Sequence, residues 1–200
     1  EHYSGLYLQD RPVDDSTIDM ILQLPEMSKL DEEPTEKDLS EAIDDLQSGK
    51  SPGNDQIPAE ILKENKEFRL PYLYKLMIVC WRKGEMPHDM IDANIVTLYR
   101  NKGDKGDCNN YRGVSLLSIT GKVFARILLK RLKKLADRIL PASQCGFRST
   151  MDMIFSLCQL QEKCQEQNPP LHVAFVDLTK SFDTVSRSGL YQGLHKIGCP

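Results

Sequence analysis

The sequence has no long apolar run. Hydrophobic residues make up 40% of its 200 residues, yet unbroken stretches such as Val173-Ala174-Phe175-Val176 fall far short of the ~18 residues that a membrane span requires. The first residues, 1–5, contain neither a basic segment nor an apolar one, so they do not resemble a secretory signal. We therefore expect a cytoplasmic or nuclear protein that makes no membrane contact.

Metal-binding and disulfide patterns are also missing. The six cysteines contain no CxxC pair, and the four histidines are spread over the whole chain, which argues against a zinc site or a disulfide framework. Reduced cysteines that pack in the interior are the better interpretation. The mean hydropathy of −0.42 and the 28% of charged residues exclude wholesale disorder, and the length suits one domain or a large piece of a bigger one.

Charge is unevenly distributed, although the formal net charge is only −3. Residues 1–50 hold 14 acidic and 4 basic side chains, whereas residues 96–138 hold 11 basic and 3 acidic ones. A positive segment attracts polyphosphate through its field and through counterion release. The basic segment is therefore a candidate for nucleic-acid binding, with a solvated helix face as the equally weighted alternative.

Hydrophobic periodicity predicts mainly helices with one β-hairpin between them. Two β-type runs, Asn94–Tyr99 and Arg112–Leu117, are joined by a long basic loop and predict the hairpin. The helix over 120–140 has an apolar side and a second face with Lys122, Arg126 and Lys130. Further helices are expected near 17–23, over 36–48, after Pro58, over 71–83, over 151–166 and from about Ser186.

The segment Leu171–Leu178 is almost continuously apolar, which predicts a strand covered on both faces, with Asp177 near its end. A carboxylate there is costly unless it caps a helix, forms a salt bridge or binds a cation. Regular geometry does not bring Asp183 beside Asp177, since six strand residues span roughly 20 Å. Capping or pairing and metal binding for phosphoryl transfer both remain open. An aspartyl-phosphate loop ranks lower, because no doubly wound α/β pattern surrounds it.

Five ordered motifs resemble the reverse transcriptases of non-LTR (long interspersed element type) retrotransposons. These motifs are Lys50–Glu60, Ile95–Gly103, Asn110–Ser118, Leu140–Arg148 and Phe175–Asp183. The family has a right-hand fold, so the resemblance implies an α+β chain that forms part of such a polymerase. It implies a lead-in segment over 1–30, a fingers-like region with helices and a β-hairpin over 31–170, and the first palm strand within 171–200.

The resemblance also implies roles for individual residues. Asp177 would be the catalytic carboxylate that binds metal, and Phe182 would lie beneath the sugar of the incoming nucleotide. Lys102 and Arg112 would bind its triphosphate. Nucleic acid would contact Gln144, Gly146, Phe147 and Arg148 along the template and, less directly implied, Lys122, Arg126 and Lys130.

The implied partners are an RNA template, a DNA primer and deoxynucleoside triphosphates, with Mg²⁺ or Mn²⁺ in the complete domain. Gln56 stands where the family usually has Gly, so we expect a turn there that is either strained or rebuilt. The segment after Arg148 is shorter than the family pattern, and the residues end before the Tyr-x-Asp-Asp hairpin that supplies further metal ligands. We therefore expect this chain to hold no metal stably and to be inactive alone. A non-catalytic nucleic-acid-binding or interaction module derived from a retrotransposon is the alternative.

Overall fold

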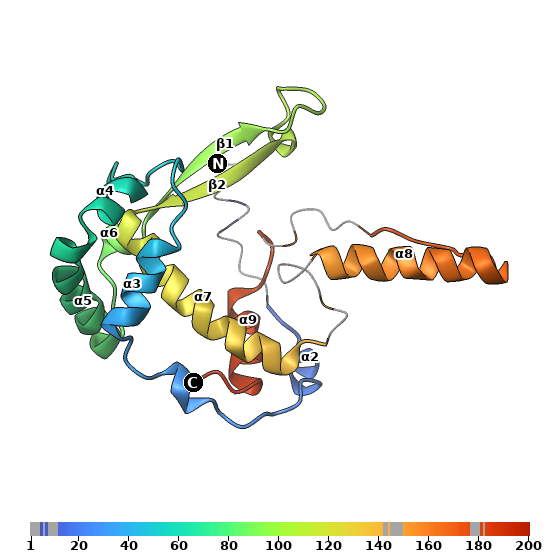
Figure 1. Ribbon diagram of the computed structural model, residues 1–200, viewed down its shortest axis with the longest axis horizontal. Coiled ribbons are helices and arrows are strands. Elements are labelled where there is room, and N and C mark those ends of the chain that lie inside the picture. The colour runs from blue at the N-terminus through green and yellow to red at the C-terminus, as the bar shows by residue number, and fades with distance from the viewer. Residues whose placement is uncertain are drawn as a thin grey trace.

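The computed structural model describes Gly5, Tyr7, residues 12–141, Gln144, residues 150–176, Ser181 and residues 183–200. These residues form helices and one two-stranded antiparallel sheet, an α+β composition as the sequence predicts. No helix within the described ranges is both long and apolar enough to cross a bilayer. Figure 1 shows a helical body from which a hairpin and one long helix project.

Three helices enclose the main core. They are α3 (Glu36–Asp44), α5 (Lys66–Lys83) and α7 (Ile119–Ile139), and the short α4 (Ala59–Glu64) and α6 (His88–Ile91) pack beside them. Side chains at helical spacing face inward from α3 and α7, including Leu39, Ile43, Val123 and Ile127. This spacing is why the sequence pattern identified both helices.

Helices α3 and α5 each have a boundary that differs from the predicted one. Helix α3 begins as expected, with Thr35 and Asp38 forming a capping box, but it ends at Asp44 and not near residue 48. Helix α5 begins at Lys66, so Pro71 lies inside it and does not start it. Pro71 has no N–H, so α5 lacks the hydrogen bond that a residue at this position would donate to Glu67 O.

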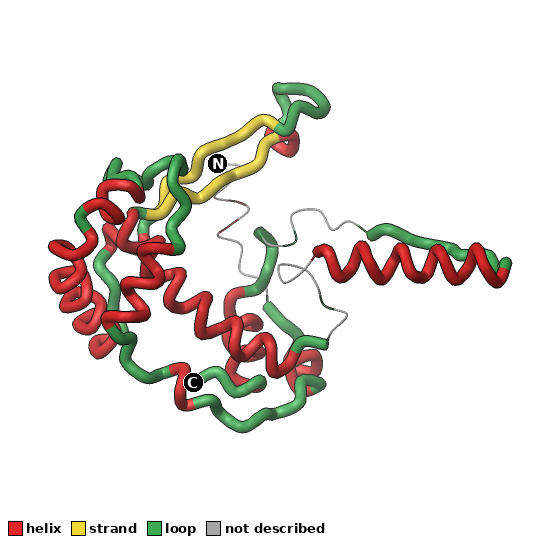
Figure 2. The backbone as a smooth tube through the Cα atoms, viewed as in Figure 1, coloured by secondary structure: helices red, strands yellow, loops and turns green. Residues whose placement is uncertain are grey.

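The hairpin prediction is confirmed. Strands β1 (Ala93–Tyr99) and β2 (Tyr111–Leu117) pair antiparallel, with Ala93 opposite Leu117 and Tyr99 opposite Tyr111. The loop between them contains a 3₁₀ turn, η2 (Cys108–Asn110). Figure 2 shows the two strands as a ribbon that extends away from the helices, with the loop at its far end.

The first and last described segments lie side by side. Helix α2 (Asp15–Asp19), shorter than the predicted 17–23, packs against α9 (Arg187–Lys196), which begins where expected, after its cap Ser186. The 3₁₀ turn η1 (Ser28–Leu30) follows α2. Backbone hydrogen bonds join Leu24 N to Lys196 O and Met27 N to Gly198 O, each 2.8 Å long. The segment before α3 is therefore tied to the end of α9.

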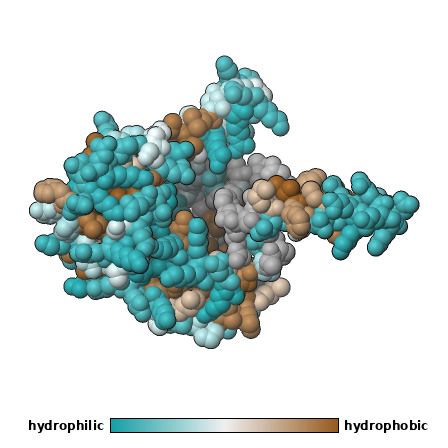
Figure 3. All heavy atoms as spheres, viewed as in Figure 1, coloured by the Kyte–Doolittle hydropathy of each residue, from teal (hydrophilic) through white to brown (hydrophobic). Residues whose placement is uncertain are grey.

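The buried strand predicted over Leu171–Leu178 is wrong for its described part. Residues 171–176 form no strand, and the side chains of Phe175 and Val176 are 88% and 84% exposed. A strand needs a neighbour for its N–H and C=O groups, and the described sheet contains β1 and β2 alone. The segment runs alongside α8 (Thr150–Gln167), a helix that projects from the body (Figure 1). Exposed apolar side chains lie on the half of α8 that is nearer to the body (Figure 3).

Candidate nucleic-acid interface

The loop over residues 49–58 joins the hairpin to the helical core. Gly53 packs so tightly on the end of β2 that a Cβ atom there would lie 2.2 Å from Leu117 O. The Asp55 carboxylate accepts a hydrogen bond from Ile119 N at 2.7 Å, and therefore caps the first turn of α7. Lys122 Nζ donates to Ser51 O at 2.9 Å. These contacts fix β2, the loop and the start of α7 relative to one another.

Gln56 has a left-handed backbone, with φ of +53°. Its N–H donates to Gly53 O at 3.1 Å and closes a four-residue turn. A non-glycine residue in this region is strained because its Cβ crowds the following carbonyl. The turn is therefore strained, which is one of the two outcomes that the resemblance predicts.

The hairpin loop is built by its own side chains. Tyr99 Oη donates to Gly103 O at 2.6 Å, and Tyr111 Oη donates to Lys105 O at 3.0 Å. The two tyrosine rings lie 5.4 Å apart, and the Lys105 ammonium is above the Tyr99 ring at 5.7 Å from its centroid. The loop that carries Lys102 is thereby held in one shape, with the Lys102 side chain exposed to solvent.

Arg112 lies on β2 and is also exposed. The register places it directly opposite Leu98, and the alternation of a strand puts Val96 and Val114 on the same face. Leu98 and Val96 are 54% and 42% exposed, so the guanidinium stands on an accessible apolar strand face. The structure thus brings Arg112 and Lys102 onto one projecting hairpin, as the sequence predicts.

Some of the basic side chains of α7 are already engaged in contacts within the protein. Lys130 forms an ion pair with Glu41 of α3, and the hydrogen bond from this ammonium lowers the pKa of the Glu41 carboxyl and raises the pKa of Lys130. Arg131 donates to Leu30 O at 2.6 Å and lies over the Trp81 ring, 4.6 Å from its centroid. The acidic first quarter of the chain therefore neutralises part of the basic segment.

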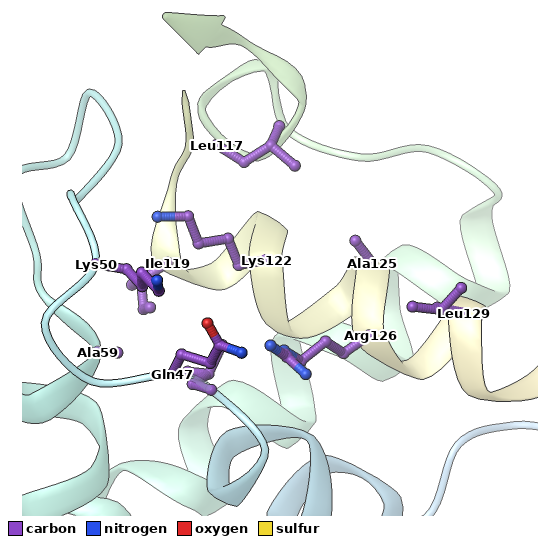
Figure 4. Close-up of a pocket in the computed structure, with 10 residues that line it drawn as sticks. Gln47, Lys50, Ala59, Leu117, Ile119, Lys122, Ala125, Arg126 and Leu129 are labelled. Atoms are coloured by element: carbon purple, nitrogen blue, oxygen red, sulfur yellow. The ribbon is translucent and has the colours of Figure 1, made fainter. Parts of the chain in front are cut away.

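A groove of about 370 Å³ lies between α7 and the segment that follows α3. Leu46, Ala59 and Leu129 contribute apolar walls, while Gln47, Lys50, Lys122 and Arg126 contribute polar groups. Figure 4 shows the Gln47 amide and the Arg126 guanidinium pointing toward one another.

Lys122 and Arg126 are among the predicted contacts with nucleic acid. Sequence reasoning placed Lys50 in a motif but assigned it no role, and it missed Gln47. No local pattern shows that their loop packs against α7.

The remaining predicted residues, apart from Gln144, fall in segments that the structure does not describe. Asp177, Phe182, Gly146, Phe147 and Arg148 lie outside the described residues. Gln144 is described and exposed, and its backbone N–H donates to Pro141 O at 2.9 Å. Among the described residues, no three His, Cys, Asp or Glu side chains are grouped so that they could hold a metal ion.

Comparison with known proteins gives the class of this chain. Residues 100–200 match the model of the reverse transcriptase family, described as RNA-dependent DNA polymerases. The match covers both the hairpin loop that carries Lys102 and the strand that carries Arg112. The chain therefore belongs to the reverse transcriptase family, as its motifs indicated.

The relatives come from non-LTR retrotransposons. The chain is 28% identical over 166 residues to the probable RNA-directed DNA polymerase from transposon BS of Drosophila melanogaster, covering 80% of this chain and 18% of that protein. It is 26% identical over 175 residues to the RNA-directed DNA polymerase from mobile element jockey of Drosophila funebris, covering 84% and 19%. A third relative, the transposon TX1 uncharacterized 149 kDa protein of Xenopus laevis, is 26% identical over 94% of this chain and 15% of its own length. The chain thus spans less than a fifth of each.

Proposed function

We propose that these residues form the fingers and the first palm segment of an RNA-directed DNA polymerase that adds deoxynucleotides to a DNA primer on an RNA template. The observation that carries this proposal is the exposed, internally braced hairpin with Lys102 and Arg112, in a chain that belongs to the reverse transcriptase family. Arginine and lysine on a rigid support suit triphosphate binding, because a loop that is already ordered loses less entropy when the ligand binds.

Each predicted residue then has a role in the complete domain. Arg112 and Lys102 bind the triphosphate, while Phe182 lies under the sugar. Template contacts come from Gln144, Gly146, Phe147 and Arg148, together with Lys122 and Arg126. Lys130 belongs to this set by prediction, and in a nucleic-acid complex it would have to exchange Glu41 for phosphate.

Asp177 is proposed as the first carboxylate ligand of a divalent metal pair. Mg²⁺ or Mn²⁺ bound there would stabilise the attacking and leaving oxygens of the transferred phosphoryl group. A polypeptide of these 200 residues contains no Tyr-x-Asp-Asp segment. We therefore expect the isolated polypeptide to bind a hybrid without extending it.

The test is a chimera in which residues 1–200 replace the matching segment of the jockey polymerase, assayed for deoxynucleotide addition to a primed RNA template. Asp177→Asn should abolish addition. Arg112→Gln should lower kcat/KM for the incoming nucleotide about 10- to 100-fold, because it removes a charge-assisted hydrogen bond. Arg69→Gln, on the exposed side of α5, is the matched control and should change neither rate nor affinity.

Two results would count against this assignment. If the unsubstituted chimera is folded and binds the primed template but adds no nucleotide, the non-catalytic nucleic-acid-binding module is the better description. Equal activity of Arg112→Gln and Arg69→Gln would remove the hairpin from triphosphate binding.

A further inference from the structure

The groove beside α7 contains cations that the protein itself does not neutralise. Elsewhere in the described chain, Lys66, Arg82, Lys130 and Lys196 each have a carboxylate partner. Lys50 and Arg126 have no such partner among the described residues, although both line one groove of about 370 Å³.

The lining residues of this groove include no acidic side chain within the described part of the chain. Glu60 follows the lining residue Ala59 but is not itself part of the lining. Its carboxylate accepts a hydrogen bond from Gly49 N at 2.5 Å, which lowers the pKa of this carboxyl. Two unpaired cations at one groove make it a site for an anionic group.

The rest of the lining restricts which anion fits. Leu46, Ala59, Ala125 and Leu129 line the same groove as the two cations, so a ligand with a flat apolar part gains more than a bare phosphate. The volume lies within the usual range for sites that take one small molecule or one ligand unit. A base stacked within a duplex cannot enter such a space, whereas an unpaired nucleotide exposes both faces of its base.

We propose that this groove binds one unpaired nucleotide of the template strand, with its phosphate on Lys50 and Arg126 and its base against Leu129. The proposal rests on the proposed function, because it takes the bound strand to be the template of a polymerase. In addition to its proposed template contact, Lys122 fixes the wall of the groove, because its ammonium donates to Ser51 O at 2.9 Å. The groove lies beside the contacts among β2, the loop over 49–58 and the start of α7, and these contacts orient the hairpin. Template binding in the groove is therefore coupled to the hairpin that binds the incoming nucleotide.

The experiment uses the full 200-residue chain and two fluorescent probes in anisotropy titrations over a range of salt concentrations. One probe is a blunt RNA–DNA hybrid, and the other is the same hybrid with an unpaired extension of the RNA strand. Arg126→Gln should weaken binding of the extended hybrid about tenfold. Its plot of log K against log salt should become shallower by about 0.7 for each single-strand phosphate that the variant no longer neutralises.

Matched variants separate a local contact from a general charge effect. Lys50→Gln should behave like Arg126→Gln, whereas the exposed Lys133→Gln and Arg69→Gln should leave the difference between the two probes unchanged. Leu129→Ala should weaken binding of the extended hybrid about fivefold without changing its salt dependence, since it removes apolar surface and no charge. Leu129 is 51% exposed, so the fold should be retained in Leu129→Ala, and a thermal melt of each variant checks this.

The outcomes distinguish the two proposals. If the unsubstituted chain binds both probes equally, or if Arg126→Gln weakens both equally, the groove is not a site for an unpaired nucleotide, while the polymerase assignment stands. If the chain binds the extended hybrid as predicted but the chimera does not polymerise, the groove assignment survives as single-strand binding, and the proposed function fails. If neither probe binds, both proposals fail.

Discussion

Replacing Gly53 by alanine should loosen the junction that joins the hairpin to the core. The added Cβ would lie 2.2 Å from Leu117 O, 2.4 Å from Leu117 C and 2.6 Å from Ser118 N. These are backbone atoms well inside ordinary van der Waals contact, so no side-chain rotation relieves the clash. The separation that follows also stretches the 2.7 Å hydrogen bond from Ile119 N to Asp55. Overpacking and the weakened charged hydrogen bond together should lower the free energy of unfolding by about 2–4 kcal/mol.

Urea unfolding followed by circular dichroism measures this change, and a thermal melt should show Tm lower by about 5–15 °C. Gly106→Ala is the matched control, because a Cβ there meets its nearest neighbour, an Asp104 oxygen, at an ordinary 3.6 Å. Hydrogen exchange at Ile119 N should accelerate in Gly53→Ala and not in the control. If the two variants differ by less than about 0.5 kcal/mol, the junction is not as rigid as the packing of Gly53 implies.

Three further substitutions test local features of the chain. Gln56→Gly should raise the free energy of unfolding by up to about 1 kcal/mol, since relief of the strain at φ +53° outweighs the added entropy of glycine in the unfolded chain; a lower Tm would contradict this. Thr35→Ala should lower the free energy of unfolding by about 1 kcal/mol, because it removes the hydroxyl that accepts from Asp38 N in the capping box. The hydrogen bonds from Thr35 hold the pKa of the Asp38 carboxyl below its ordinary value. This carboxylate therefore contributes stability that is present above pH ~4 and is lost as pH falls through its folded pKa. In urea titrations, the free energy of unfolding should fall less at acid pH in Thr35→Ala than in the unsubstituted chain. A double-mutant cycle of Lys130→Ala and Glu41→Ala should give almost no coupling in the free energy of unfolding, because both side chains are more than 40% exposed. A large coupling would show that the pair is shielded from solvent.

The sequence by itself determined the features that depend on near neighbours. Helix α7 was predictable because its apolar residues recur at helical spacing, and α3 because Thr35 and Asp38 form a capping box within one turn. The hairpin followed from two β-type runs around a turn-rich loop. Five short motifs in order were enough to identify the family, since motif residues need no tertiary contact to be recognised.

The tertiary structure decided which charges remain available for a ligand. Lys130 and Arg126 sit one helical turn apart on the same helix, yet one is paired with Glu41, 89 positions away, and the other lines an unneutralised groove. The carboxylate that caps α7 comes from Asp55, 64 positions before Ile119. Segment 171–176 also could not be predicted from local sequence. Its apolar composition predicts a buried strand, but a strand needs a paired neighbour, and the described sheet offers none to this segment. Contacts between residues so far apart depend on how the elements pack, which no local pattern in the sequence records.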